Sequence, residues 1–177
     1  EAITFFEDDN IVKLYGSGAN EVRQAFAELK GRLYELKRQN KQTLFLAYYS
    51  GHGSKEGLHI QGEVLSKYEL KSLFDNLGAD MQVLILDACE SGDFLRAKGG
   101  VIKSRVEVKA TDELDSKGTI ILSSSAAGEL AQESEEYQGG VFSHHLLNGL
   151  NGLADYNSDG EINVLEAFHY ARFATQS

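Results

Sequence analysis

Several scarcities limit what this chain of 177 residues can be: it has no proline, no tryptophan, one methionine and one cysteine. Without proline, its turns depend on 18 glycines and on Asn and Asp residues. One cysteine excludes an internal disulfide and gives no sign of a cross-linked secreted scaffold, so we expect a cytoplasmic protein. No apolar run is long enough to span a bilayer, and residues 1–4 lack the layout of a signal peptide, so we expect no membrane partner.

Positive charge is also scarce, because 17 Lys and Arg residues are outnumbered by 27 Asp and Glu residues, for a net charge of -10. Such a surface repels phosphates, so we expect no nucleic-acid partner. The same charge is compatible with a cationic substrate or a divalent metal. With 42% hydrophobic and 25% charged residues, the composition predicts one globular domain over residues 1–177.

Two short apolar runs, residues 44–49 and 83–86, each lead into a polar segment that contains a reactive side chain. Both runs are continuous and rich in β-forming residues, which is typical of strands buried on both faces of a parallel sheet. The first run is followed by His52 and the second by Cys89. Since chemistry in open α/β sheets gathers at the carboxyl ends of the strands, the sequence predicts that these two side chains meet at one edge.

The remaining pattern predicts helices and strands in alternation. We expect one or two short strands within residues 3–15, a helix over 20–40, a hairpin at 58–60 and 64–65, a helix from Ser66 to about Gly78, a strand at 119–122, and helices over 141–150 and 163–174. Ser66 and Glu69 form the pattern of a capping box. The expected fold is therefore a three-layer α/β/α sandwich with a largely parallel central sheet. The long loop at about residues 92–117 is of a length that is usually functional or disordered.

A thiol with an imidazole nearby is a nucleophile with a base, which is the minimum for covalent acyl transfer. Glycines on both sides of His52 let the main chain approach a substrate closely. Taken alone, a single cysteine after an apolar strand is more often a small buried hydrophobe. The two residues together are much more specific than either one.

The segments YSGHG at residues 49–53 and DACESG at residues 87–92 resemble the caspase-like cysteine peptidases, and most closely the metacaspases and bacterial caspase homologues. Residues 88–92 also resemble the legumains of the same clan. The similarity extends over nearly the whole chain, including residues 123–128 and 139–143, and implies the caspase-like fold.

The resemblance implies a role for each matching residue. Cys89 is expected to be the nucleophile and His52 the general acid and base, with the amides of Gly53 and Cys89 as the oxyanion hole. Ser50 and Asp87 are expected to line the pocket for the residue before the cut, and Glu133 is expected to match a further acidic position that adds to this pocket. A carboxylate in a closed pocket favours a Lys or Arg side chain, because an unpaired buried charge is costly. The other interpretation of Asp87 is a strand-end carboxylate that caps nearby amides.

The chain departs from the family at its start, since the family has a strand and a helix before the part that residues 3–40 resemble. We therefore expect a cleaved-off or separate N-terminal segment that completes the pocket. We expect activation by cleavage after a basic residue of the loop at about 92–117. Asp115, at the end of an acidic tetrapeptide, would instead suit a caspase-type cut. Two other functions stay open: a peptidase that cuts after Asn or Asp, and a catalytically silent homologue with a scaffolding or calcium-responsive role.

Residues 155–166 match the EF-hand calcium loop, with oxygen ligands at places one, three and five, glycine at six and a carboxylate at twelve. The candidate ligands are Asp155, Asn157, Asp159, Glu161 and Glu166. An Asx-rich turn between two helices would use the same residue types, and only one such loop is present. Calcium would stabilise the C-terminal helix pair, whereas the chemistry itself requires no cofactor.

Overall fold

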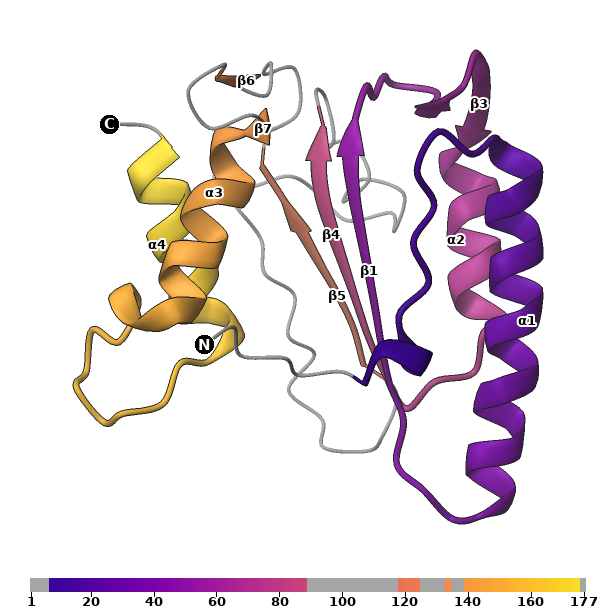
Figure 1. The fold of residues 1–177 in the computed structure, drawn as a ribbon, viewed down its shortest axis with the longest axis horizontal. Helices are drawn as coiled ribbons and strands as arrows, with labels where there is room; N and C mark the ends of the chain where they lie inside the picture. Colours follow the sequence, from indigo (N-terminus) through magenta and orange to yellow (C-terminus); the bar gives the residue numbers. More distant parts are fainter. Residues whose placement is uncertain (1–6, 89–117, 125–132, 135–138, 176–177) are drawn as a thin grey trace, which may run out of the picture.

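The computed structural model describes residues 7–88, 118–124, 133–134 and 139–175 (Figure 1). The early elements are η1 (Asp8–Asn10), α1 (Ala19–Arg38), β1 (Leu44–Gly51), β2 (Gly57–Ile60), β3 (Glu63–Ser66), α2 (Lys67–Asp75) and β4 (Met81–Ala88). The later elements are β5 (Gly118–Ser123), β6 (Glu133–Ser134), β7 (Gly139–Gly140), α3 (Val141–Asn148), the π-helical turn η3 (Gly149–Leu153) and α4 (Val164–Thr175).

A parallel sheet of order β1-β4-β5 forms the middle layer of the described structure. Helices α1 and α2 lie on one side of this sheet and α3 and α4 on the other (Figure 1). The expected α/β/α sandwich with a parallel central sheet is therefore confirmed. Two small antiparallel pairs, β2-β3 and β6-β7, accompany the sheet.

Strand β4 is buried on both of its faces, as its continuous apolar sequence predicts. Leu84 and Leu86 pack into the cluster under α1 and α2, whereas Val83 and Ile85 pack into the cluster under α3 and α4. Each cluster has an aromatic centre. In the first cluster the rings are Phe26, Phe45 and Phe74, with centroids 5.3 to 5.5 Å apart; in the second they are Phe142 and Phe168, at 5.9 Å. The strand that leads to Cys89 is thus held in place by packing on both of its faces.

The expectation that β1 is also buried on both faces is wrong. Phe45 faces the core beneath α1 and α2, but Leu44, Leu46 and Tyr48 are 41 to 51% exposed. The reason is position, because β1 lies at the edge of the described sheet, and the cluster beneath α3 and α4 takes its sheet residues from β4 and β5.

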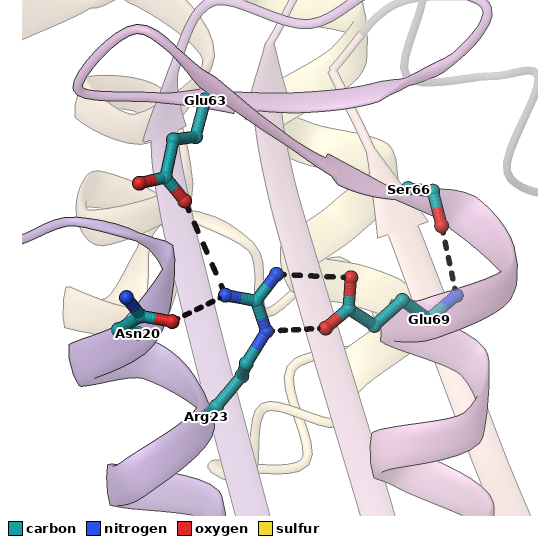
Figure 2. Close-up of polar contacts among 5 residues, drawn as sticks. All are labelled: Asn20, Arg23, Glu63, Ser66 and Glu69. Atoms are coloured by element: carbon teal, nitrogen blue, oxygen red, sulfur yellow. Dashed lines mark hydrogen bonds and ion pairs between the residues drawn. The ribbon is translucent and has the colours of Figure 1, made fainter.

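Helices α1 and α2 are joined by a network around Arg23 (Figure 2). The guanidinium group donates from Nε to Glu69 Oε1 at 2.5 Å and from Nη2 to Glu69 Oε2 at 3.2 Å. This bidentate hydrogen bonding lowers the pKa of the Glu69 carboxyl. Ser66 caps α2 as expected, since its Oγ accepts from Glu69 N at 3.1 Å. The carboxylate of Glu69, the other residue of the capping box, binds Arg23 and so connects α2 to α1.

Asp80 lies at the end of the sheet where β1 and β4 begin, opposite the end from which they lead to His52 and Cys89. One carboxylate oxygen lies 2.8 Å from Lys37 Nζ, and the other accepts from the Thr43 amide at 2.9 Å and the Thr43 hydroxyl at 2.8 Å. These hydrogen bonds, that of Lys37 first, lower the pKa of Asp80 to about 2. The group therefore connects the end of α1 to the starts of two strands.

The expected early strands are not found in residues 7–15, where the described chain has only the 3-10 turn η1. A strand needs a neighbour to satisfy its main-chain groups, and the side chains of Ile11, Val12, Leu14 and Tyr15 are exposed there. The rest of the expected strand region, residues 3–6, lies outside the described residues. Among the helices that are described, none has the length and apolar character required to cross a membrane.

Candidate active site

The two strands that lead to His52 and Cys89 end side by side. The parallel register pairs Ser50 with Asp87 and Gly51 with Ala88. Adjacent strands lie about 5 Å apart, so His52 and Cys89 follow directly from neighbouring points of the sheet. Cys89 itself lies outside the described residues. What the structure fixes is the position of Ala88, directly before it, which is fully buried at the end of β4.

His52 begins a short loop that returns through β2. The loop is closed by a bridge between Gly53 and Leu58, whose hydrogen bonds run from His59 N to His52 O and from Ser54 N to Gly57 O, both at 2.9 Å. Neither bond uses the amide of Gly53. The His52 side chain is exposed. The strand end therefore presents an accessible imidazole, followed by an amide that this ladder does not engage.

Asp87 is a buried carboxylate, 4% exposed, at the carboxyl end of β4. Its Oδ2 accepts from the amide of Ser143 at 3.2 Å and from the hydroxyl of the same residue. The Ser143 hydroxyl also lies 2.6 Å from the hydroxyl of Tyr48. Since Ser143 is in the first turn of α3, the carboxylate caps that helix from a neighbouring strand. The interpretation of Asp87 as a strand-end carboxylate that caps nearby amides therefore holds for one of its two oxygens, Oδ2.

Gly140 is the closest neighbour of this carboxylate among the described glycines. A Cβ at Gly140 would lie 1.9 Å from Asp87 Oδ2, so only glycine fits at this point. Gly140 pairs with Glu133 in the β6-β7 ladder, which brings the main chain of Glu133 next to the start of α3. The structure describes only the main chain of Glu133. Its expected place in the pocket stays a prediction.

Ser50 lies on β1 at the register position opposite Asp87, and its side chain is exposed. Register partners of adjacent strands share a face of the sheet. The structure therefore brings Ser50, Asp87 and the start of the His52 loop to one edge. The loop at about 92–117 and its candidate cleavage positions lie outside the described residues.

Sequence reasoning missed three residues around Asp87: Ser143 donates to the carboxylate, Tyr48 contacts the Ser143 hydroxyl, and Gly140 leaves room for the carboxylate. The signal for Gly140 and Ser143 was a glycine pair directly before an apolar helix start, with a hydroxyl residue in its first turn. Their partner comes from a strand more than fifty residues earlier. Local patterns do not contain such a contact.

The loop at residues 155–166 is built on its own Asp and Asn side chains. Asp155 accepts from the amides of Asp159 and Gly160, at 3.2 and 3.1 Å, and Gly160 has a φ of 81°. Glu166 accepts from Asn163 N at 3.0 Å at the start of α4. Across the part of the chain that the structure describes, no group of three or more His, Cys, Asp or Glu residues is arranged to hold a metal ion.

Comparison with known families agrees with this geometry. The sequence model of the Caspase domain matches residues 12–172, which is most of the chain. The chain therefore belongs to the Caspase domain family and is of the caspase-like cysteine peptidase type. The resemblance expected from residues 49–53 and 87–92 is confirmed at the level of this family. A search of the curated proteins finds no match.

Proposed function

We propose that this protein is a cysteine endopeptidase, of the metacaspase and bacterial caspase-homologue type, that cuts after Arg or Lys. The Cys89 thiolate attacks the scissile carbonyl carbon, and the Gly53 and Cys89 amides donate to the oxyanion. His52 protonates the leaving amine, which departs and leaves a thioester. His52 then takes a proton from water, whose oxygen attacks the thioester and releases the acid and the thiolate.

The observation that carries the proposed specificity is the environment of Asp87. The carboxylate is buried two positions before Cys89, and none of the ion pairs among the described residues involves it. A buried charge without a counter-charge is costly, so a cationic side chain entering this site would gain more than a neutral one. Both contacts from Ser143 reach Oδ2. In this proposal the substrate cation pairs with Oδ1.

Activation in this proposal comes from cleavage after a basic residue between about 92 and 117. The segment carries several Lys and Arg residues and directly follows the Cys89 motif. Mass spectrometry of the protein after incubation should locate the cut. Replacing Cys89 with Ala should prevent the cut in a sample kept free of other peptidases.

The first experiment is a panel of fluorogenic peptides that end in Arg, Lys, Asn or Asp, each tested with calcium and with a chelator. We expect cleavage after Arg and Lys, with none in Cys89→Ala, while circular dichroism shows an intact fold. Cleavage after Asn or Asp would keep the peptidase but overturn the role of Asp87. Turnover by Cys89→Ala at the wild-type rate would refute the mechanism.

A second experiment separates the pocket role of Asp87 from its capping role. Asp87→Asn keeps the size of the side chain and removes its charge. Loss of one partner of a buried charge pair costs about 2 to 5 kcal/mol, so kcat/KM on Arg peptides should fall about 30- to 4,000-fold. Peptides ending in citrulline, a neutral analogue of arginine, should lose much less. Equal losses on Arg and citrulline peptides would leave Asp87 with the capping role alone.

The competing function is a catalytically silent homologue with a scaffolding role, because members of this family can be inactive. An electrophilic peptide that ends in Arg distinguishes the two. A reactive Cys89 is labelled by it, whereas a buried structural thiol stays inert. Absence of both labelling and cleavage, in a chain extended at its N-terminus, would favour the silent homologue.

We also propose calcium binding at residues 155–166. The order of oxygen-bearing residues and the left-handed Gly160 support it, while the present arrangement of carboxylates does not form a metal site. Isothermal titration at millimolar calcium should show one site, lost in Asp155→Ala. No heat of binding in the wild type would refute the proposal.

A further inference from the structure

Tyr49 places its hydroxyl group between two parts of the His52 loop. The hydroxyl oxygen lies 2.9 Å from His52 O and 2.9 Å from His59 O, so it donates to both carbonyls or alternates between them. The ring packs against the core beneath α1 and α2. The Tyr49 side chain therefore extends from the hydrophobic core to both ends of the His52 loop, where the chain leaves β1 and where it enters β2.

The His52 carbonyl is the common acceptor in this arrangement. It receives the Tyr49 hydroxyl and the amide of His59, each at 2.9 Å. One donor comes from β1 and the other from β2. The main chain at His52 is therefore held from both sides.

The glycine before His52 is shaped by the same phenol. Gly51 has a φ of 157°, and a Cβ there would lie 2.7 Å from the Tyr49 hydroxyl oxygen. Glycine thus permits the chain to pass close to the phenol. The same residue also makes the chain flexible, because glycine has the largest conformational freedom in the unfolded loop. A loop with Gly51 and Gly53 on either side of a reactive imidazole needs an external constraint.

We propose that the Tyr49 hydroxyl is a positioning group, which fixes the main chain of His52 and thereby the imidazole and the Gly53 amide. The proposal rests on the proposed peptidase function, since it concerns the same site. In this proposal Tyr49 acts through the His52 carbonyl. A displacement of about 1 Å at a catalytic group can cost about 100-fold in rate.

Burial raises the pKa of the Tyr49 hydroxyl above its ordinary value, which favours the protonated form that can donate. The second end of the loop has its own bond, between His59 Nε2 and Ser54 Oγ at 2.8 Å. Removal of the phenol oxygen should consequently loosen the His52 end of the loop and leave the hairpin formed.

The test is Tyr49→Phe, which removes one oxygen atom and keeps the packed ring. Tyr34→Phe is the matched control, because Tyr34 is 64% exposed on α1, in a helix that carries none of the active-site residues. We expect Tyr49→Phe to lower kcat on Arg peptides about 10- to 100-fold with KM changed less than about twofold. The control should keep both constants. An unchanged kcat, or a fall that is matched by an equal loss of folded protein, would overturn the proposal.

Hydrogen exchange gives a readout that is independent of turnover. We call the two hydrogen bonds to the His52 carbonyl, from the Tyr49 hydroxyl and the His59 amide, the clamp. Because the His59 amide is one of its two donors, the exchange rate of that amide reports on the clamp directly. In Tyr49→Phe its exchange should be at least about 5-fold faster, with no change in Tyr34→Phe. If the wild type neither cleaves nor labels, the proposed function fails, and unchanged exchange at His59 would then refute the clamp as well. Faster exchange with unchanged kcat would leave a structural clamp and refute the positioning role.

Discussion

Ser143→Ala tests whether a helix-start serine holds the buried carboxylate of Asp87. The change removes the Oγ donor to Oδ2 and leaves the amide donor at 3.2 Å in place. A hydrogen bond to a charged group contributes about 1.5 to 3 kcal/mol, so we expect a loss of about 2 kcal/mol in the free energy of unfolding. Tyr48, which also contacts Ser143, is half exposed, so water can replace that contact.

Urea unfolding followed by circular dichroism measures this loss, provided that the slope of the transition is unchanged. Ser66→Ala is the comparison, since Ser66 accepts one amide bond at a partly buried helix start and its loss should cost about 1 kcal/mol. In an Asp87→Asn background the cost of Ser143→Ala should also fall to about 1 kcal/mol, because the acceptor is then neutral. A loss for Ser143→Ala no larger than for Ser66→Ala, or no coupling to Asp87, would refute the reasoning.

Three further changes have definite expected outcomes. Gly140→Ala places a Cβ 1.9 Å from a buried carboxylate oxygen, so unfolding free energy should fall by about 3 kcal/mol. Gly57→Ala places one 2.1 Å from the Leu65 carbonyl oxygen, so β2 and β3 should separate, with faster amide exchange at Leu65 and its neighbours. In Asp80→Asn, thermal stability should fall less between about pH 4 and pH 2 than it does in the wild type. The folded pKa of Asp80 is depressed to about 2, so its contribution is present above the unfolded pKa and is lost as the pH falls through the folded one.

Two controls belong to these changes. Gly31 lies in the middle of α1 with nothing within 4 Å of its Cβ position, so Gly31→Ala should raise stability by about 0.5 to 1 kcal/mol. A similar gain for Gly140→Ala would mean that the contact with Asp87 is not made. For Asp80, the melting temperatures of Asp80→Asn and Asp75→Asn are measured in parallel. Asp75 belongs to an exposed ion pair within α2, so this comparison separates the effect of Asp80 from that of an exposed ion pair. Equal acid profiles for wild type and Asp80→Asn would exclude the expected role.

Local patterns predicted most of the fold because each element carries its own signal. The stripe of Phe26, Leu29 and Leu33 marks α1 along one face, and Ser66 marks the start of α2. The edge position of β1 was not visible, because the sequence of residues 44–49 is as apolar as that of a central strand. Whether a strand is covered on both faces depends on which helices lie over it, and this is decided by elements far along the chain.

The candidate site was predictable to the level of residue types and strand ends. His52 and Asp87 were singled out because each comes at the end of an apolar run, and parallel strands end at a common edge. The residues that hold them were not found, since Ser143 meets Asp87 across more than fifty residues and the Tyr49 hydroxyl is directed at main-chain carbonyls. A tyrosine in an apolar run carries no sign of which way its hydroxyl will turn.

The parallel pairing of β4 with β5 has a consequence for a chain that is cut between about 92 and 117. The two strands share six register positions, from Met81 with Gly118 to Leu86 with Ser123. In β5, Ile121 packs against the cluster beneath α1 and α2, and Leu122 belongs to the cluster beneath α3 and α4. Nicking would therefore leave two polypeptides that remain one particle without a covalent link. They should elute together from a gel-filtration column, separate only in denaturant, and regain the native sheet when mixed at equal concentration. Reassembly would then be a bimolecular reaction, so the stability of the nicked protein would depend on its concentration.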